Sequence, residues 1–157
     1  MSEGDPLTAR LFGSVGSIDA ARWDALAGPD NPFVSHAFLS ALEDSGSVGP
    51  GTGWSPAPIG IEGPDGTLLA AMPLWLKGHS QGEYVFDHAW ADAWHRAGGD
   101  YYPKLQIAVP FTPATGPRLL LSDEALATPL LRAAETLCAS NGFSSAHATF
   151  IAPQQVP

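Results

Sequence analysis

The sequence predicts a mixed fold, α/β or α+β, in a single domain, and three observations support this. Hydrophobic residues make up 45% of the 157 residues, which is enough for a packed core. Short apolar runs alternate along the chain with segments of helical periodicity. The 17 Gly and 15 Pro lie between these runs, so they mark turns and do not form a low-complexity segment. The resulting order mixes helices and strands throughout.

The first third of the chain predicts one strand and two helices. Leu7–Val15 alternates apolar and small residues, as a strand does. Ser17 or Asp19 is placed to cap a short helix, which the Gly-Pro pair at 28–29 ends. Ser35 caps a second helix over Ser35–Asp44, whose apolar residues share one face.

The middle of the chain predicts a β-hairpin and a further strand. Pro58–Glu62 and Thr67–Lys77 are apolar runs separated by the turn sequence Gly-Pro-Asp-Gly. After a Gly-containing turn at 78–82, Glu83–Asp87 is the next predicted strand.

The last part predicts helices and strands in alternation. His88–Ala97 is a predicted helix that Gly98-Gly99 ends, and Leu105–Val109 and Arg118–Leu121 are predicted strands. Thr128, followed by Pro129, caps a helix that ends at Asn141-Gly142. Ser144–Ile151 is the final predicted strand. One face of the long helix carries four apolar or small residues: Leu130, Ala134, Leu137 and Cys138.

The charge balance limits the partners of the chain. Seven basic and 16 acidic residues give a net charge of −9, which opposes binding to DNA and makes tRNA a poor partner for this chain alone. The sequence has no apolar run long enough for a transmembrane helix, so we expect no membrane insertion. Its N-terminus does not have the pattern of a secretory leader, so we expect a cytoplasmic location. The single Cys138 fits a reducing compartment.

Four segments carry a resemblance to a known family. They are KGHSQGEYVFDHAWADAW (Lys77–Trp94), YYPKLQIAVPFTP (Tyr101–Pro113), GPRLLL (Gly116–Leu121) and PFVSHAFLSALEDSGSVGPGTGW (Pro32–Trp54). They resemble bacterial FemAB-like N-acyltransferases of the GNAT (acyl-CoA N-acyltransferase) superfamily, over roughly Trp23 to Ile151. The resemblance implies a GNAT-like fold, a twisted mixed sheet flanked by helices. It also implies a longer protein of two such halves, of which residues 1–157 are the first, truncated at the C-terminal end.

The same resemblance implies transfer of an acyl or aminoacyl group to an amine, with a small molecule or a peptidoglycan precursor as acceptor. An acyl-CoA or aminoacyl donor is then expected. GNAT domains bind the CoA pyrophosphate on the N–H groups of a Gly-rich loop at a helix N-terminus. Neither Gly78–Gly82 nor Thr115–Arg118 matches that pattern, so no complete pyrophosphate loop is present in the sequence.

Acyl transfer needs a base for the amine and donors for the oxyanion, and one stretch is rich in suitable groups. Glu83 and His88 are the candidate catalytic residues, and Asp87, Asp92 and His95 are candidates for substrate binding. On a helix, positions 88, 92 and 95 share a face opposite Trp90, Trp94 and Ala97, which we expect to face the core. The alternative is a solvated face with local Asp–His pairs. A metal site of the same trio lacks Cys and a recognised partner, so no metal is expected.

Tyr101, Tyr102, Lys104 and Arg118 are further candidates for substrate binding. The tyrosines either line a groove or anchor an irregular segment to the core. Arg118 either meets a phosphate or carboxylate or forms a surface ion pair.

Two functions remain open at this stage. The first is an acyltransferase module, complete only in the longer protein. The second is a non-catalytic structural or protein-interaction domain in which the cofactor loop has degenerated.

Overall fold

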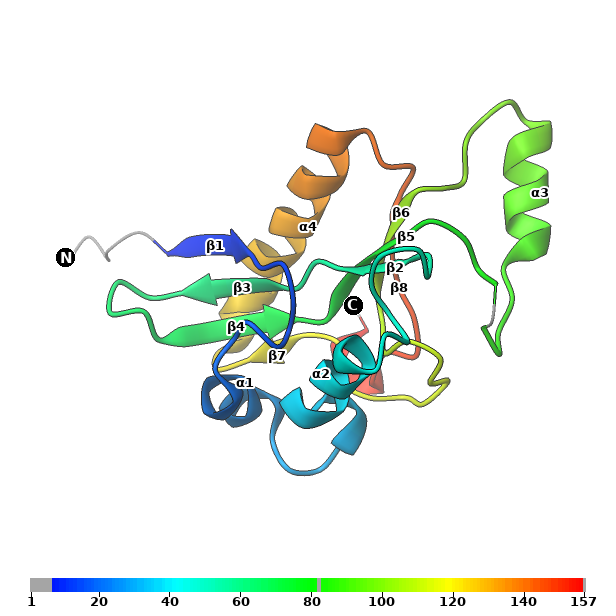
Figure 1. Ribbon diagram of the computed structural model, residues 1–157. Coiled ribbons are helices and arrows are strands. Elements are labelled where there is room, and N and C mark those ends of the chain that lie inside the picture. The colour runs from blue at the N-terminus through cyan, green and yellow to red at the C-terminus, as the bar shows by residue number, and fades with distance from the viewer. Residues whose placement is uncertain (1–6, 82, 157) are drawn as a thin grey trace.

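The computed structural model describes residues 7–81 and 83–156, and within them the chain forms an α+β fold (Figure 1). The described α-helices are α1 (Ala20–Ala27), α2 (His36–Asp44), α3 (His88–Arg96) and α4 (Ala127–Asn141). The described strands are β1 (Thr8–Leu11), β2 (Trp54–Pro56), β3 (Ile59–Glu62), β4 (Leu68–Met72), β5 (Leu74–Lys77), β6 (Lys104–Ile107), β7 (Leu120–Leu121) and β8 (Ala146–Ala148). Three short 3-10 helices are η1 (Pro32–Val34), η2 (Glu124–Leu126) and η3 (Pro153–Gln155).

The strands form two four-stranded sheets. One has the order β1-β3-β4-β7 and is antiparallel throughout; the other has the order β2-β5-β6-β8 and pairs β6 with β8 in parallel. The mixed class is therefore confirmed, while its GNAT-like character stays a prediction. No helix of the described residues is both long and apolar enough to cross a bilayer.

Pro73 divides the predicted strand Thr67–Lys77 between the two sheets. It lies between β4, which pairs with β3, and β5, which pairs with β6. Proline has no N–H for a sheet ladder, so a run predicted as one strand is interrupted here. The result places β5 and its last residue, Lys77, in the second sheet.

Two apolar clusters hold the elements together. One lies against α1 and α2 and contains the buried Trp23 and Trp75, whose indole N–H groups donate to the carbonyls of Val34 (2.8 Å) and Ala108 (2.9 Å). The other lies beneath α4. It contains the predicted apolar face of that helix, with Leu130 and Ala134 buried and Leu137 and Cys138 packed against the cluster.

Helix starts and stops follow the predicted caps, with one exception. Asp19 accepts from the N–H of Arg22 and caps α1, and Ser35 accepts from Phe38 and caps α2. The predicted cap at Thr128 is wrong, because η2 runs directly into α4, which begins at Ala127. Pro129 then lies in the first turn of α4, where a missing N–H costs no helical bond.

The segment after β5 differs most from the prediction. Glu83–Asp87 is irregular and not a strand. The helix that follows it is present, but its aromatic face is not packed in the core as expected. Trp90 and Trp94, expected in the core, are 74% and 52% exposed, and Ala91 is the buried residue of the helix. The reason is that α3 stands apart from both sheets (Figure 1), so no core lies beside its tryptophans.

The remaining strands are shorter than predicted. β1 ends at Leu11, β7 has two residues, and β8 covers Ala146–Ala148 instead of Ser144–Ile151. Ile151 makes one isolated parallel bridge with Gly116. β8 lies at the edge of its sheet.

Candidate functional site

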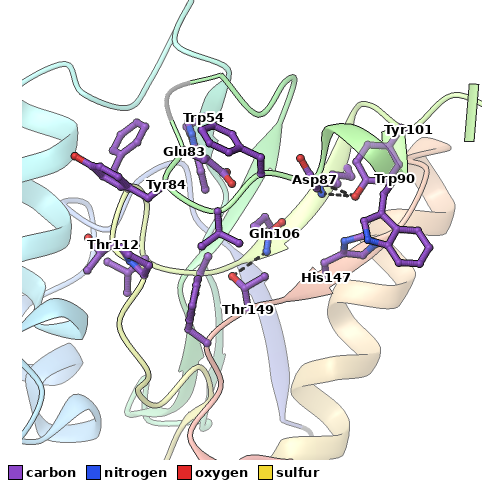
Figure 2. Close-up of a pocket in the computed structure, with 18 of the residues that line it drawn as sticks. Trp54, Glu83, Tyr84, Asp87, Trp90, Tyr101, Gln106, Thr112, His147 and Thr149 are labelled. Atoms are coloured by element: carbon purple, nitrogen blue, oxygen red, sulfur yellow. Dashed lines mark hydrogen bonds and ion pairs between the residues drawn. The ribbon is translucent and has the colours of Figure 1, made fainter. Parts of the chain in front are cut away.

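A pocket of about 550 Å³ lies between the second sheet and the segment 83–96, which we call the aromatic arm. The arm comprises the irregular stretch 83–87 and helix α3 up to Arg96. Figure 2 shows Tyr84 and Thr112 at one end of the pocket and Trp90 and His147 at the other. Its volume is in the range typical of small-molecule sites.

Two buried lysines lie beside the pocket on neighbouring strands. Lys77 of β5 and Lys104 of β6 are each 1% exposed and are directly paired in register. Each forms an ion pair with a carboxylate of the arm: Lys77 with Glu83, and Lys104 with Asp87, whose Oδ2 lies 2.5 Å from Nζ. These two ion pairs attach the arm to the sheet.

Asp87 accepts several hydrogen bonds. In addition to Lys104, the hydroxyl of Tyr101 donates to Oδ2 (3.0 Å) and that of Tyr102 donates to Oδ1 (3.2 Å). Burial alone would raise the pKa of the Asp87 carboxyl, but the hydrogen bonds and the positive charge of Lys104 hold that pKa well below its usual value. Asp87 is therefore ionised at every pH near neutrality.

Burial shifts the pKa values of the neighbouring groups. It lowers the pKa of Lys77 to about 8, an effect that Asp87 opposes and Lys104 increases. It raises the pKa of Tyr101 and of Tyr102 to about 12, with the charge of Asp87 adding to the rise. Both phenols thus stay protonated and continue to donate to Asp87.

A row of polar groups from β6 and β8 faces the same pocket. Gln106 is buried, and its Nε2 donates to the Oγ1 of Thr149 (3.2 Å). His147 lies opposite Gln106 in the parallel register and also lines the pocket. Burial lowers the pKa of His147, and Lys104 lowers it further, so its imidazole is neutral at pH 7.

The rest of the lining is apolar and largely aromatic. The arm contributes Tyr84, Val85, Phe86, Trp90 and Trp94. The body of the domain contributes Trp54, Val109, Phe111, Pro113 and Phe150. Trp54 packs edge-on against Phe111 with ring centroids 5.7 Å apart, so the body side of the pocket is continuous with the core.

The structure brings part of the sequence-predicted site together. Glu83, Asp87, Tyr101 and Lys104 all line the pocket. Tyr102 lies behind Asp87 and also contacts Ser80. The sequence left open whether the tyrosines line a groove or anchor an irregular segment. In the structure both tyrosines anchor the segment through Asp87, and Tyr101 also lines the pocket.

Helix α3 places the other candidates elsewhere. His88, Asp92 and His95 are exposed and are absent from the pocket lining. The ring of His88 stacks on Phe86, with centroids 5.2 Å apart. Among the described residues, no group of three His, Cys, Asp or Glu side chains is arranged to hold a metal ion.

Arg118 has a different environment from either one predicted for it. Its side chain is 1% exposed, so the surface ion pair is wrong. The guanidinium donates to the carbonyls of Thr149 (2.9 Å), Ala114 (2.8 Å) and Pro117 (3.1 Å). It ties the loop before β7 to the segment after β8; Arg118 itself is absent from the pocket lining, although Thr149, whose carbonyl it contacts, belongs to that lining.

The two glycine-containing segments considered for a cofactor use several of their N–H groups within the chain. Gly78 donates to the carbonyl of Gly53 (2.9 Å), and Gly116 donates to Phe150 (3.0 Å). The N–H of Arg118 donates to the side chain of Gln155 (2.7 Å). Gly82, the end of the first segment, lies outside the described residues.

Besides Thr149, which also lines the pocket, sequence reasoning missed four residues of this site: Lys77, Trp54, Gln106 and His147. Lys77 carries a signal, because a lysine closes the apolar strand sequence LWLK at a position that a buried strand gives to an apolar residue. The other three have no local signal, since only the pairing of β6 with β8 and the return of the arm bring them together.

Comparison with protein families identifies the chain. The FemAB-like family, described as peptidoglycan biosynthesis/recognition, matches residues 14–157. The chain therefore belongs to the FemAB-like family, and a peptidoglycan-related function fits it. Comparisons with curated proteins and with solved structures give no significant match.

Proposed function

We propose that the pocket is the site at which an acyl or aminoacyl group is transferred to an amine. The observation that supports this most directly is that His147 of β8 and Thr149, which directly follows β8 and continues its ladder through the bond of its N–H to the carbonyl of Ile107 (3.2 Å), both line the pocket. Residues at i and i+2 of a strand project on the same side. A neutral imidazole and a hydroxyl thus face the same pocket.

The two groups match the needs of the reaction. A neutral imidazole at pH 7 accepts the proton that the attacking amine loses. The Oγ1 of Thr149 already accepts a hydrogen bond from Gln106, so its own proton is available to donate to the oxyanion of the tetrahedral intermediate. The imidazolium then returns a proton to the leaving group.

This assignment differs from the candidates chosen from sequence. Glu83 lines the pocket but is held by Lys77, and His88 stacks on Phe86 on the exposed side of the arm. We therefore place the base at His147 and give Glu83 and Asp87 the role of positioning the arm.

The proposed substrates follow from the family. The family description supports a peptidoglycan precursor, whose amine is the proposed acceptor. The donor that we propose beside it is an acyl-CoA or an aminoacyl ester. A negatively charged donor such as tRNA would be repelled by the net charge of −9, unless another part of the protein supplies basic residues. We propose that a second GNAT-like half completes the donor site.

The test is a transfer assay on the full natural protein with a lysine-containing peptidoglycan peptide as acceptor. Acetyl-CoA and an aminoacyl ester serve as donors, and mass spectrometry detects the acylated amine. We expect His147→Gln to lower the rate by about 10²–10⁴-fold, and Thr149→Val to lower it less. The comparison variant is His88→Gln, which should keep the rate. Loss of activity in His88→Gln but not in His147→Gln would refute the assignment of the base.

A non-catalytic role is the second candidate, and one observation favours it. Several N–H groups that a pyrophosphate would need are bonded within the chain at Gly78, Gly116 and Arg118. A recognition module of this kind would bind a peptidoglycan precursor without turnover. Binding of the precursor peptide together with an absence of product for both donors would support this role over transfer.

A further inference from the structure

The charged groups beside the pocket cancel one another. Lys77 and Lys104 are buried, and each is paired with a carboxylate, Glu83 or Asp87. The Nζ of Lys104 is also 3.0 Å from the hydroxyl of Tyr101, which it contacts in addition to Asp87. An anionic ligand group could therefore pair with a lysine only if that lysine's ion pair with its carboxylate were broken. A cationic ligand group could pair with a carboxylate only if the same ion pair were broken. Both exchanges cost free energy in a buried site.

His147 does not change this balance. It is the remaining titratable group of the lining near Lys104, and its pKa is lowered by burial and by that lysine. A positive charge on the imidazole would be repelled by Lys104. The polar end of the pocket thus offers hydrogen bonds from His147 and Thr149 but no net charge.

The side of the pocket that the arm forms is apolar and exposed to an unusual degree. Tyr84, Phe86, Trp90 and Trp94 of the arm are each more than half exposed although they line a concave space. Large apolar surfaces that remain open in a concave site are typical of ligand-binding grooves. The unfavourable free energy of exposing these side chains to water is removed when an apolar ligand group fills the space between the arm and the sheet.

We propose that the pocket binds an uncharged, apolar acyl group. The carbonyl end lies at His147 and Thr149, and the hydrocarbon part extends between the arm and Phe111 toward Tyr84 and Thr112, along the direction visible in Figure 2. This inference rests on the proposed acyl transfer and narrows its substrate class. It excludes acyl groups that carry a charge in the part that enters the pocket.

Three ligands with one hydrocarbon tail and different heads test this directly: octanamide, octanoate and octylammonium. Their binding is measured by calorimetry at pH 7 on the unmodified protein, with neither acyl donor nor amine acceptor present. We expect octanamide to bind at least about tenfold more tightly than either ion, a difference of the size that one unpaired partly buried charge produces. Trp90→Ala should weaken octanamide by about fivefold or more, because Trp90 lies beside His147 and its ring supplies apolar contact next to the carbonyl end of the ligand.

Leu131→Ala is the matched control, since Leu131 is also an exposed apolar residue but lies on α4 outside the pocket lining. It should leave octanamide binding unchanged. Binding of octanoate or octylammonium as tight as that of octanamide would overturn the proposal, because it would reveal a free charge in the pocket. Absence of octanamide binding, with the protein forming dimers that Trp90→Ala dissociates, would also overturn it and assign the arm to a protein interface. Octanamide binding without any transfer activity would support the pocket's ligand class and count against the proposed reaction alone.

Discussion

Lys77 and Lys104 lie directly opposite each other on the adjacent antiparallel strands β5 and β6, and both side chains are buried. Like charges at directly opposed sheet positions destabilise a sheet, and burial adds to the cost. The chain compensates with two carboxylates from the arm, Glu83 and Asp87. The positive charges of Lys77 and Lys104 in the sheet thus fix the position of the arm. Because the arm forms one side of the pocket, the shape of the pocket depends on these two ion pairs.

Replacing Asp87 with Asn should destabilise the protein strongly. The change leaves Lys104 buried without its carboxylate and weakens two hydrogen bonds from Tyr101 and Tyr102. Breaking one side of a buried pair costs about 3 kcal/mol in the free energy of unfolding. Urea denaturation at pH 7 measures this, with Asp92→Asn on the exposed face of α3 as the control. Equal stability of the two variants would show that Lys104 reaches solvent.

The contribution of the Asp87–Lys104 pair to the free energy of unfolding should decrease at acid pH. The pKa of Asp87 is lower in the folded protein than its ordinary value of 3.8. Its contribution to stability is therefore complete above pH 3.8 and is lost as the pH falls below that value. The stability difference between the wild type and Asp87→Asn should shrink as the pH falls through that acid range.

For the ion pair between Lys77 and Glu83, we expect the two single substitutions to have unequal effects on stability in a double-mutant cycle. Glu83→Gln leaves Lys77 charged and buried and should cost about 3 kcal/mol at pH 7. Lys77→Met should cost less, because the Glu83 side chain is 18% exposed whereas that of Lys77 is 1% exposed. The double variant should match Lys77→Met within about 0.5 kcal/mol. Additive losses would show that the two residues act independently.

Lys77 should make protein stability increase with pH in the alkaline range. Burial lowers its pKa from 10.5 to about 8, so in that interval the unfolded chain holds a proton that the folded chain has lost. The contribution of this group to stability therefore rises with pH between about 8 and 10.5. Lys77→Met should remove this rise.

Two of the three tyrosines should ionise unusually late. Burial raises the pKa of Tyr101 and Tyr102 from 10.0 to about 12, with the charge of Asp87 contributing. Their contribution to stability is complete below pH 10 and is lost between 10 and 12. Titration of tyrosinate by ultraviolet absorbance measures this. In Asp87→Asn both transitions should move toward 10; unchanged transitions would mean that burial alone sets them.

The sequence was sufficient for the elements whose signals are local. Asp19 and Ser35 cap their helices as predicted, and Gly142 ends α4 in the left-handed conformation that favours glycine. It was insufficient where tertiary context decides. Periodicity located helix α3 correctly, but it assumed that the aromatic face of a helix packs on a core, and here Trp90 faces a pocket instead.

The site was predictable to a similar extent. Asp87, Tyr101 and Lys104, chosen from two nearby stretches of sequence, do lie together beside the pocket, while their role in substrate binding stays a prediction. His147 was missed because its proximity depends on the parallel pairing of β8 with β6, which no local pattern encodes. Helical spacing suggested His88 instead, and that side chain points away from the pocket lining.

The titration of His147 tests the electrostatics of the pocket without any assay of activity. Burial and then Lys104 lower its pKa below 6.5, so its neutral form is favoured in the folded protein. Stability from this group should increase as the pH rises through the folded pKa to 6.5, and should be constant above it. Imidazole proton resonances followed by NMR, with His147→Gln for assignment, report the pKa directly. Lys104→Met should raise it, because the repelling charge is gone. A value above 6.5 in the wild type would mean that a carboxylate outweighs Lys104, and the pocket would then favour cationic ligands over uncharged ones.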